Sequence, residues 1–240
     1  MNNQMRKTDR ERQTERGRGI ERLRGVMKAP PHHAVKGVQN YLEDAVRSLK
    51  PENEISLSIS SRTDTGVHAL GNSAHFDLQR QNGKPPFSEE VLVDALNFHL
   101  RPEPIRITRA YRVPGGFHAR FRAVSRTYVY RLAAGVTHHS CTPLTDANLC
   151  WGLRHTDIQF WELTFKSRSF LYKQVRRMTG ALVAVGQGQM SVSGVKELLE
   201  AQDSQAYPHN LTSPPEGLFL TRVEYHRSDL QPYTQEDSQS

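Results

Sequence analysis

Cysteine is scarce in this sequence, and long apolar runs are missing. Cys141 and Cys150 are the only cysteines and can form one disulfide bond at most, which excludes a disulfide framework and indicates a reducing compartment. No apolar run approaches the roughly 18 residues of a membrane-spanning helix, and no apolar signal segment lies near the start. We therefore expect an intracellular globular protein without a membrane partner, in the mitochondrion or in the cytoplasm and nucleus.

Motifs that bind cofactors or activate nucleophiles are also missing. The chain has no G-x-S-x-G, Walker or G-x-G-x-x-G motif. Four residues that could bind zinc, His138, His139, Cys141 and Cys150, have a spacing that matches no standard zinc finger. We expect neither a metal site nor an organic cofactor.

Positive charge is in excess, with a formal net charge of +7 and a pI near 9.6. Between residues 101 and 131, eight arginines and several aromatic residues accompany a single acid, Glu103. Because a guanidinium matches phosphate and stacks on bases, this pattern predicts an RNA surface; a merely solvated strand face is the alternative. The arginines are Arg101, Arg106, Arg109, Arg112, Arg120, Arg122, Arg126 and Arg131, and a second cluster comprises Lys166, Arg168, Lys173, Arg176 and Arg177.

Apolar periodicity predicts an α+β fold, with a mainly antiparallel sheet that carries helices on one side. Ser88 is a suitable N-cap for the second helix, and in the third helix Leu171, Val175 and Leu182 share the predicted core face. Two polar segments flank the folded part, residues 1–36 and 227–240. The first is a basic arm that is expected to be disordered. The predicted helices are 38–49, 89–100, 171–186 and 194–201, and the predicted strands are 55–60, 73–78, 105–111, 127–133, 158–165 and 218–225.

Residues 60–77 place chemically active side chains in a turn between two half-buried strands. Arg62 and Asp64 are two residues apart, so in an extended chain they project from the same side and can form an ion pair. A neighbouring guanidinium favours an ionised carboxylate, which suits nucleophilic attack. Ordinary turn chemistry is the alternative, because Asp64 can bond to nearby backbone amides and Gly66 can supply a positive φ.

The same turn resembles the signature of the TruA-type tRNA pseudouridine synthases. Residues 62–69 read Arg-Thr-Asp-Thr-Gly-Val-His-Ala and differ from the family's usual R-T-D-A-G-V-H-A only at Thr65. The resemblance extends from about residue 37 to residue 226 and is greatest for the eukaryotic pseudouridylate synthase-like branch. Further matches follow in the family's order at residues 38–43, 95–100, 117–121, 125–130, 170–180 and 217–220.

This resemblance implies a cofactor-free isomerase that converts uridine to pseudouridine in tRNA or another structured RNA. It also implies two subdomains, residues 37–115 and 116–226, that form a central cleft. By analogy with the family, the chain is also expected to form a homodimer. The resemblance implies that Asp64 is the nucleophile, which attacks ribose or base, and that Arg176 pairs with Asp64. It implies that Tyr128 stacks on the target base. The implied RNA contacts are Arg62, His68 and Arg126.

Structural roles are the alternatives for these residues. Tyr128 could be a core aromatic of its strand, as we expect for Tyr130, and Arg176 could be a surface arginine at the edge of its helix. His68 could pack within its loop. A hydrolase that uses Asp77 or Asp94 with a metal would need clustered carboxylates, which the sequence does not show.

Two departures from the family's pattern lead to a second functional hypothesis. The basic arm stands where family members have a first strand and a Gly-rich loop, and the segment between Tyr128 and Arg176 is shorter than in the family. The family has a His-Asp-Phe-x-x-Phe motif in this segment, and residues 155–157, His-Thr-Asp, do not replace it. The alternative to an active synthase is a catalytically inactive relative that binds RNA, as an assembly or ribosome-associated factor.

Overall fold

The computed structural model describes residues 25–28, 36–136, 145–154, 159–203 and 205–231. The chain forms two compact units. Unit 1 comprises Met1–Gly66, Ser73–Arg122 and Tyr225–Ser240, and unit 2 comprises Val67–Asn72 and Ala123–Glu224. This division differs from the predicted subdomain limits, which stay a prediction. Within the described residues, no helix is both long enough and apolar enough to cross a membrane.

The described part of unit 1 is built on the helices α2 (Val38–Arg47) and α3 (Glu89–His99). They share a core with the segment before the short strand β1 (Ser58–Ile59), which pairs with β3 (Ala74–His75). Two 3-10 turns, η1 (Gln81–Gly83) and η4 (Arg227–Leu230), complete this unit. The buried core residues are Ala45, Val46, Ile55, Leu57, Leu96 and Leu100.

The cap of α3 confirms one sequence prediction. The side chain of Ser88 accepts a hydrogen bond from the backbone N–H of Val91, at 3.4 Å. Glu89 and Glu90 lie in the first turn, where carboxylates interact favourably with the helix dipole. This helix therefore begins where its sequence signals place it.

The predicted strand at 105–111 is wrong, although its alternation is real. Ile105 and Ile107 pack against the core of unit 1, as an alternating segment should. However, the N–H of Ile107 donates to Oδ1 of Asn97 at 2.8 Å, and its carbonyl accepts from Nδ2 of Asn97 at 2.9 Å. The backbone groups of Ile107 are satisfied by one side chain of α3 rather than by a neighbouring strand.

Unit 2 contains a mixed sheet whose central strand is β4 (Ser125–Ala134). β4 pairs antiparallel with β6 (Gln159–Ser167) and β7 (Leu218–Glu224). Two short strands that the sequence did not predict add parallel pairs, β2 (His68–Ala69) on β7 and β5 (Trp151–Leu153) on β4. The α+β class is confirmed, while the sheet is mixed.

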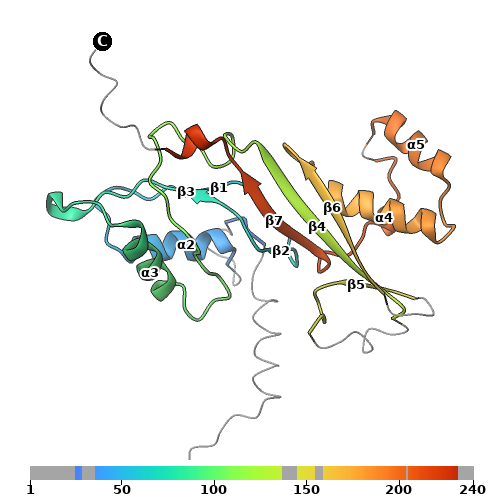
Figure 1. Cartoon of the computed structure of the whole chain (residues 1–240), viewed down its shortest axis with the longest axis horizontal. Helices are drawn as coiled ribbons and strands as arrows, with labels where there is room; N and C mark the ends of the chain where they lie inside the picture. Colours follow the sequence, from blue (N-terminus) through green and yellow to red (C-terminus); the bar gives the residue numbers. More distant parts are fainter. Residues whose placement is uncertain (1–24, 29–35, 137–144, 155–158, 204, 232–240) are drawn as a thin grey trace, which may run out of the picture. The chain divides into compact units, whose positions relative to one another are not determined.

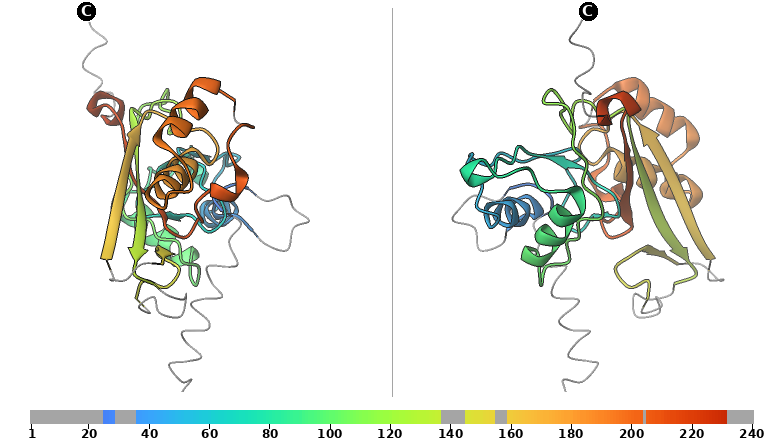
Figure 2. Two further views of the ribbon diagram at one scale, coloured as in Figure 1. Left: turned by 90° about the vertical axis from the view of Figure 1, so that its right-hand side faces the viewer. Right: turned by 60° about the vertical axis from the view of Figure 1, so that its left-hand side comes forward.

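Helices α4 (Gln174–Gly186) and α5 (Val192–Ala201) lie on the same side of this sheet (Figures 1 and 2). Val175 and Val183 of α4 join the buried cluster, and a 3-10 turn, η3 (His209–Leu211), contacts the same helix. The predicted face of α4 is right at Val175, which is buried, and wrong at Leu182, which is exposed, while Leu171 precedes the helix. The strand residues of the cluster are Tyr128, Tyr130, Leu132, Leu218 and Leu220.

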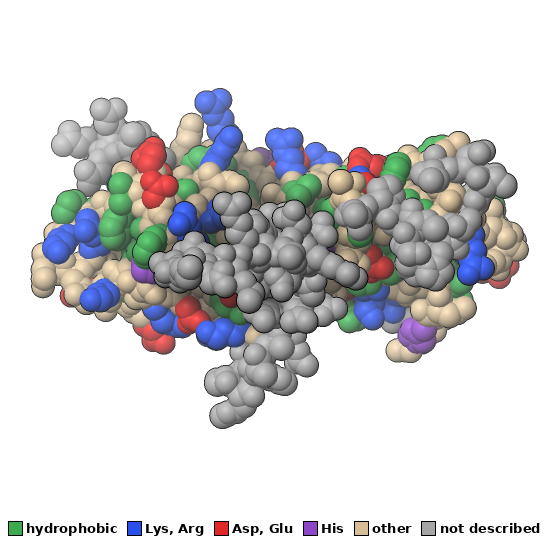
Figure 3. Space-filling view, turned by 90° about the horizontal axis from the view of Figure 1, so that it is seen from below, with side chains coloured by type: hydrophobic (Ala, Val, Ile, Leu, Met, Phe, Trp, Pro, Cys, Tyr) green, Lys and Arg blue, Asp and Glu red, His purple; other side chains and the backbone are tan. Residues whose placement is uncertain are grey.

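The described surface mixes side chains of all kinds. In the view from below, basic residues lie beside exposed hydrophobic and acidic ones (Figure 3).

On α5, Val192 and Leu199 are about three-quarters exposed, at 75% and 72%. The apolar spacing that predicted α5 was therefore sufficient to locate a helix but did not indicate burial.

Candidate functional site

The loop that carries Asp64 is fixed at its base by the two short strands of unit 1. The N–H of Ser60 donates to the carbonyl of Ser73 at 2.8 Å, which continues the pairing of β1 with β3. Thr63 is buried, Asp64 is half-buried and Gly66 has φ of +82°. The loop is therefore anchored on both sides of the carboxylate.

A segment within the predicted basic arm supports the same loop. The N–H of Val26 donates to the carbonyl of Thr63 at 3.3 Å. Gly25 has φ of +60°, and a Cβ there would lie 2.6 Å from the Thr63 oxygen, so only glycine allows this approach. The carbonyls of Gly25 and Val26 in turn accept from the first amides of α2, Val38 at 3.1 Å and Gln39 at 3.0 Å. Residues 25–28 are thus part of unit 1.

A buried carboxylate lies next to this segment. Glu43 of α2 is 3% exposed and accepts from Lys28 at 2.7 Å, with further bonds from Gln39 and Arg47. Burial would raise the pKa of Glu43, but these three donors outweigh it and leave the pKa below its usual value. The ion pair joins residues 25–28 to α2 by a second type of contact.

The predicted ion pair between Arg62 and Asp64 is not formed among the described residues. Arg62 is exposed, whereas the neighbouring Ser61 and Thr63 are buried. Its guanidinium lies within 4.0 Å of no described carboxylate. An exposed guanidinium of the loop, with no carboxylate within 4.0 Å in the described part of the chain, is accessible to an anionic ligand.

Tyr128 and Tyr130 both belong to the core of unit 2. Tyr130 is fully buried and its hydroxyl donates to the carbonyl of Pro214 at 2.7 Å. Burial raises the pKa of Tyr130 far above its usual value, so this side chain stays neutral. Tyr128 is 8% exposed and its ring packs edge-on against Phe170, with ring centroids 5.4 Å apart.

Arg176 lies in the first turn of α4 and is held by a loop that follows the helix. Its Nε donates to the carbonyl of Ser213 at 2.7 Å. The N–H and Oγ of Ser213 donate in return to the carbonyl of Arg176, at 3.2 and 3.0 Å. Because Ser213 is fully buried, this reciprocal contact fixes the arginine rather than leaving it as a mobile surface side chain.

The sequence did not identify this loop, which packs tightly on α4. Tyr207 donates through its hydroxyl to the carbonyl of Arg177 at 2.9 Å. A Cβ at Gly180 would lie 1.7 Å from the carbonyl oxygen of Leu211, so the two backbones are in direct contact. A glycine in the middle of an apolar helix was the available signal, because such a glycine often marks close approach.

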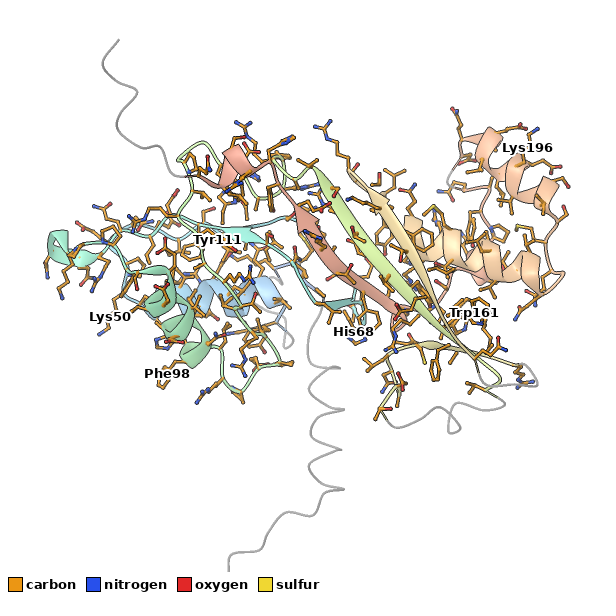
Figure 4. All side chains as sticks on the ribbon, viewed as in Figure 1. Lys50, His68, Phe98, Tyr111, Trp161 and Lys196 are labelled. Atoms are coloured by element: carbon orange, nitrogen blue, oxygen red, sulfur yellow. The ribbon has the colours of Figure 1, made fainter. Side chains whose placement is uncertain are left out.

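The remaining predicted RNA contacts are held by protein groups. Arg126 is 8% exposed and donates through Nη1 to the carbonyl of Arg168. His68 is labelled in Figure 4. Its ring stacks on Phe219 with ring centroids 4.7 Å apart, and its Nε2 lies 3.0 Å from the carbonyl of Asn148. The contacts place Arg126 inside unit 2 and His68 against the sheet.

The arginine run divides between the two units. Arg131 of unit 2 is compensated by acids that are distant in the sequence, with Asp146 at 3.1 Å and Glu162 at 3.4 Å. In unit 1 the aromatic side chains of Tyr111 and Phe121 are 60% and 70% exposed among the arginines. This part fits the predicted RNA surface, and its exposed arginines are Arg101, Arg106, Arg109, Arg112, Arg120 and Arg122.

His75 of β3 organises the segment at residues 117–119. Nδ1 of His75 accepts from the N–H of Ala119 at 3.1 Å, and the hydroxyl of Tyr225 donates to the Ala119 carbonyl at 2.7 Å. His75 also contacts the rings of Phe117 and His118. The lone pair on Nδ1 is required for this arrangement, so His75 must be neutral.

We expect His75 to titrate below its ordinary pKa of 6.5, because burial and, next, the charge of His118 disfavour the imidazolium. Its contribution to stability is complete above pH 6.5 and is lost as the pH falls through the lowered folded-state pKa. An NMR titration of the histidine rings measures this directly. A His75 pKa at or above 6.5 would contradict the expectation.

Metal ligands do not gather in the described part of the chain. No group of three His, Cys, Asp or Glu side chains there is arranged to hold an ion. Cys150 is a buried thiol outside any disulfide, and burial raises its pKa. His138, His139 and Cys141 lie outside the described residues.

Comparisons with known proteins identify the family of this chain. The sequence profile of the family described as tRNA pseudouridine synthase matches residues 25–122 and 137–226. The chain belongs to this family and is an isomerase by class. Asp64 and Arg176 lie within the matched segments, and Tyr128 lies between them.

The relatives include eukaryotic and bacterial proteins. The chain is 44% identical over 271 positions to tRNA pseudouridine synthase-like 1 of Xenopus laevis, with 89% of this chain and 91% of that protein covered. It is 41% identical over 246 positions to the Homo sapiens protein of the same name, covering 79% and 81%. It is 33% identical over 227 positions to tRNA pseudouridine synthase A of Afipia carboxidovorans, covering 78% and 89%. The resemblance found in the sequence is confirmed.

Proposed function

We propose that this chain isomerises uridine to pseudouridine in tRNA and that the carboxylate of Asp64 is the nucleophile. The observation that carries the proposal is the double anchoring of the Asp64 loop, by Ser60 to Ser73 and by Val26 to Thr63. A nucleophile must be held in a defined position, and backbone hydrogen bonds on both sides of the residue provide this. The loop sequence resembles the family signature at the same residues.

The reaction exchanges one bond for another without an oxidant or a cofactor. The glycosidic bond between N1 of uracil and C1′ of ribose breaks, the base turns, and C5 forms the new bond to C1′. The hydrogen on C5 leaves as a proton, and N1 gains one. Covalent attachment through an Asp64 oxygen divides this exchange into two steps, which is the general advantage of nucleophilic catalysis.

The other residues have supporting roles in this proposal. The Arg176 guanidinium balances the carboxylate charge, and the contact with Ser213 holds it in place. Tyr128 stacks on the flipped-out base, and the exposed Arg62 contacts the RNA backbone. The central cleft and the two subdomains that the family resemblance implies are part of the same proposal.

Tritium release from tRNA labelled at uridine C5 tests this function, because isomerisation must expel that hydrogen. We expect the wild-type chain to release tritium over many turnovers. A matched tRNA labelled at C6, a position that keeps its hydrogen, should release none. A folded chain that binds tRNA and releases no tritium from C5 would favour the inactive RNA-binding relative instead.

A further inference from the structure

The turn between β6 and α4 exposes two large apolar side chains. Leu171 is 80% exposed and Tyr172 is 71% exposed, although both residues belong to the segment that the sequence predicted as helix. The preceding Phe170 is directed inward and packs against Tyr128. A single turn therefore holds one ring in the core and presents the next one to solvent.

This exposure is built into the backbone. The N–H of Leu171 donates to Oε1 of Gln174 at 2.8 Å, and the N–H of Gln174 donates to the carbonyl of Leu171 at 3.0 Å. Lys173 has a left-handed conformation with φ of +56°, which is unfavourable for a residue with a side chain. The buried Arg126 also holds the start of the turn by donating to the carbonyl of Arg168. Because the turn is already fixed, binding a ligand at Tyr172 costs little further conformational entropy of the chain.

The surroundings of Tyr172 favour an anionic ligand. The ammonium group of Lys173 lies 5.0 Å from the centroid of the Tyr172 ring. The sequence contains no acid from residue 163 to residue 196, and it contains six basic residues there. The ammonium lies over one face of the ring. An aromatic ring with a cation over one face can bind a nucleotide, with the base on the other face and the phosphate near the charge.

We propose that Tyr172 is a stacking platform for an unpaired nucleotide of the RNA substrate, next to the target uridine, and that Lys173 attracts its phosphate. The proposal rests on the proposed function, because Tyr128 would receive the target base. Phe170 contacts Tyr128. Tyr172 follows Phe170 by two residues, so the Cα atoms of Phe170 and Tyr172 lie no more than about 8 Å apart. The platform would keep the RNA strand open beside the flipped base.

Two variants and a matched control test the platform. We expect Tyr172→Ala to weaken RNA binding and raise KM for tritium release about 5- to 150-fold, the scale of losing one base-aromatic stack, with kcat little changed. Tyr172→Phe keeps the ring and should behave as the wild type. Phe98→Ala removes a 69% exposed aromatic from α3 of unit 1 and should change neither quantity.

A fluorescent base separates this proposal from the proposed function. A short uridine-rich RNA with one 2-aminopurine should lose fluorescence on binding the wild-type chain and the Tyr172→Phe variant, but not Tyr172→Ala. If Tyr172-dependent quenching occurs without tritium release, the platform stands and the catalytic function fails. Tritium release with unchanged RNA binding and quenching in Tyr172→Ala would overturn the platform and point to another partner for this turn. Equal losses in Tyr172→Phe and Tyr172→Ala would also overturn stacking.

Discussion

The Asp64→Asn variant should lose tritium release by about 10⁴-fold or more, the scale on which an enzyme loses its nucleophile. An amide has nearly the shape of a carboxylate but is a much weaker nucleophile, so the chemical step is removed while the side-chain volume is kept. The loop should remain in place, because Ser60 and Val26 hold it through backbone groups. Single-turnover release with saturating enzyme measures the chemical step alone.

A matched control changes a second aspartate in the same region. Asp77 is exposed and follows β3, so Asp77→Asn makes the same chemical change at another aspartate of unit 1. We expect it to keep full tritium release, and both variants should have the wild-type melting temperature. Activity of Asp64→Asn within tenfold of the wild type would refute the nucleophile assignment while leaving family membership intact.

Of the proposed variants, Gly180→Ala should lower the free energy of unfolding the most. The added Cβ would lie 1.7 Å from the Leu211 oxygen and 2.9 Å from its carbonyl carbon, so a backbone segment must move. Because overpacking alone costs typically 1–3 kcal/mol, we expect a loss of about 3 kcal/mol or more and a melting temperature lower by roughly 6–12 °C. The displaced loop also carries Ser213, so Arg176 loses its anchor and activity should fall with stability.

Gly186→Ala is the corresponding control, since Gly186 belongs to the same helix and has no atom within 4 Å of its added Cβ. The change should be neutral or stabilising by up to about 1 kcal/mol, because alanine favours a helix more than glycine does. Thermal unfolding of the two variants measures the difference. Equal stability of Gly180→Ala and Gly186→Ala would show that the Leu211 loop is not packed as described.

The sequence was most reliable where an element is long and periodic. The helices at Val38–Arg47 and Glu89–His99, and the strands Ser125–Ala134 and Gln159–Ser167, lie close to their predicted ranges. Strands of two or three residues, such as His68–Ala69, are too short to show alternation. The 105–111 segment alternates correctly, but alternation reports burial, and the backbone there is paired with Asn97.

The candidate site was found from the sequence only in part. The Arg-Thr-Asp turn was recognisable from local chemistry and from its resemblance to the family. The loop that holds Arg176 was not, because Ser213 is 37 residues away in the sequence and has no distinctive neighbours. The exposed Leu182 shows the same limit, since a helix buried through small residues such as Ala181 and Ala184 has a weak hydrophobic pattern.

The contact of Gly25 with Thr63 also bears on how this sequence can change over generations. Residues 1–36 have the composition of a segment in which most substitutions are neutral. At Gly25, however, any side chain would meet the backbone beside Asp64, so selection on the site extends to a position that hydropathy marks as unconstrained. The boundary of tolerated variation should therefore fall just before residue 25, well ahead of the start of α2 at Val38.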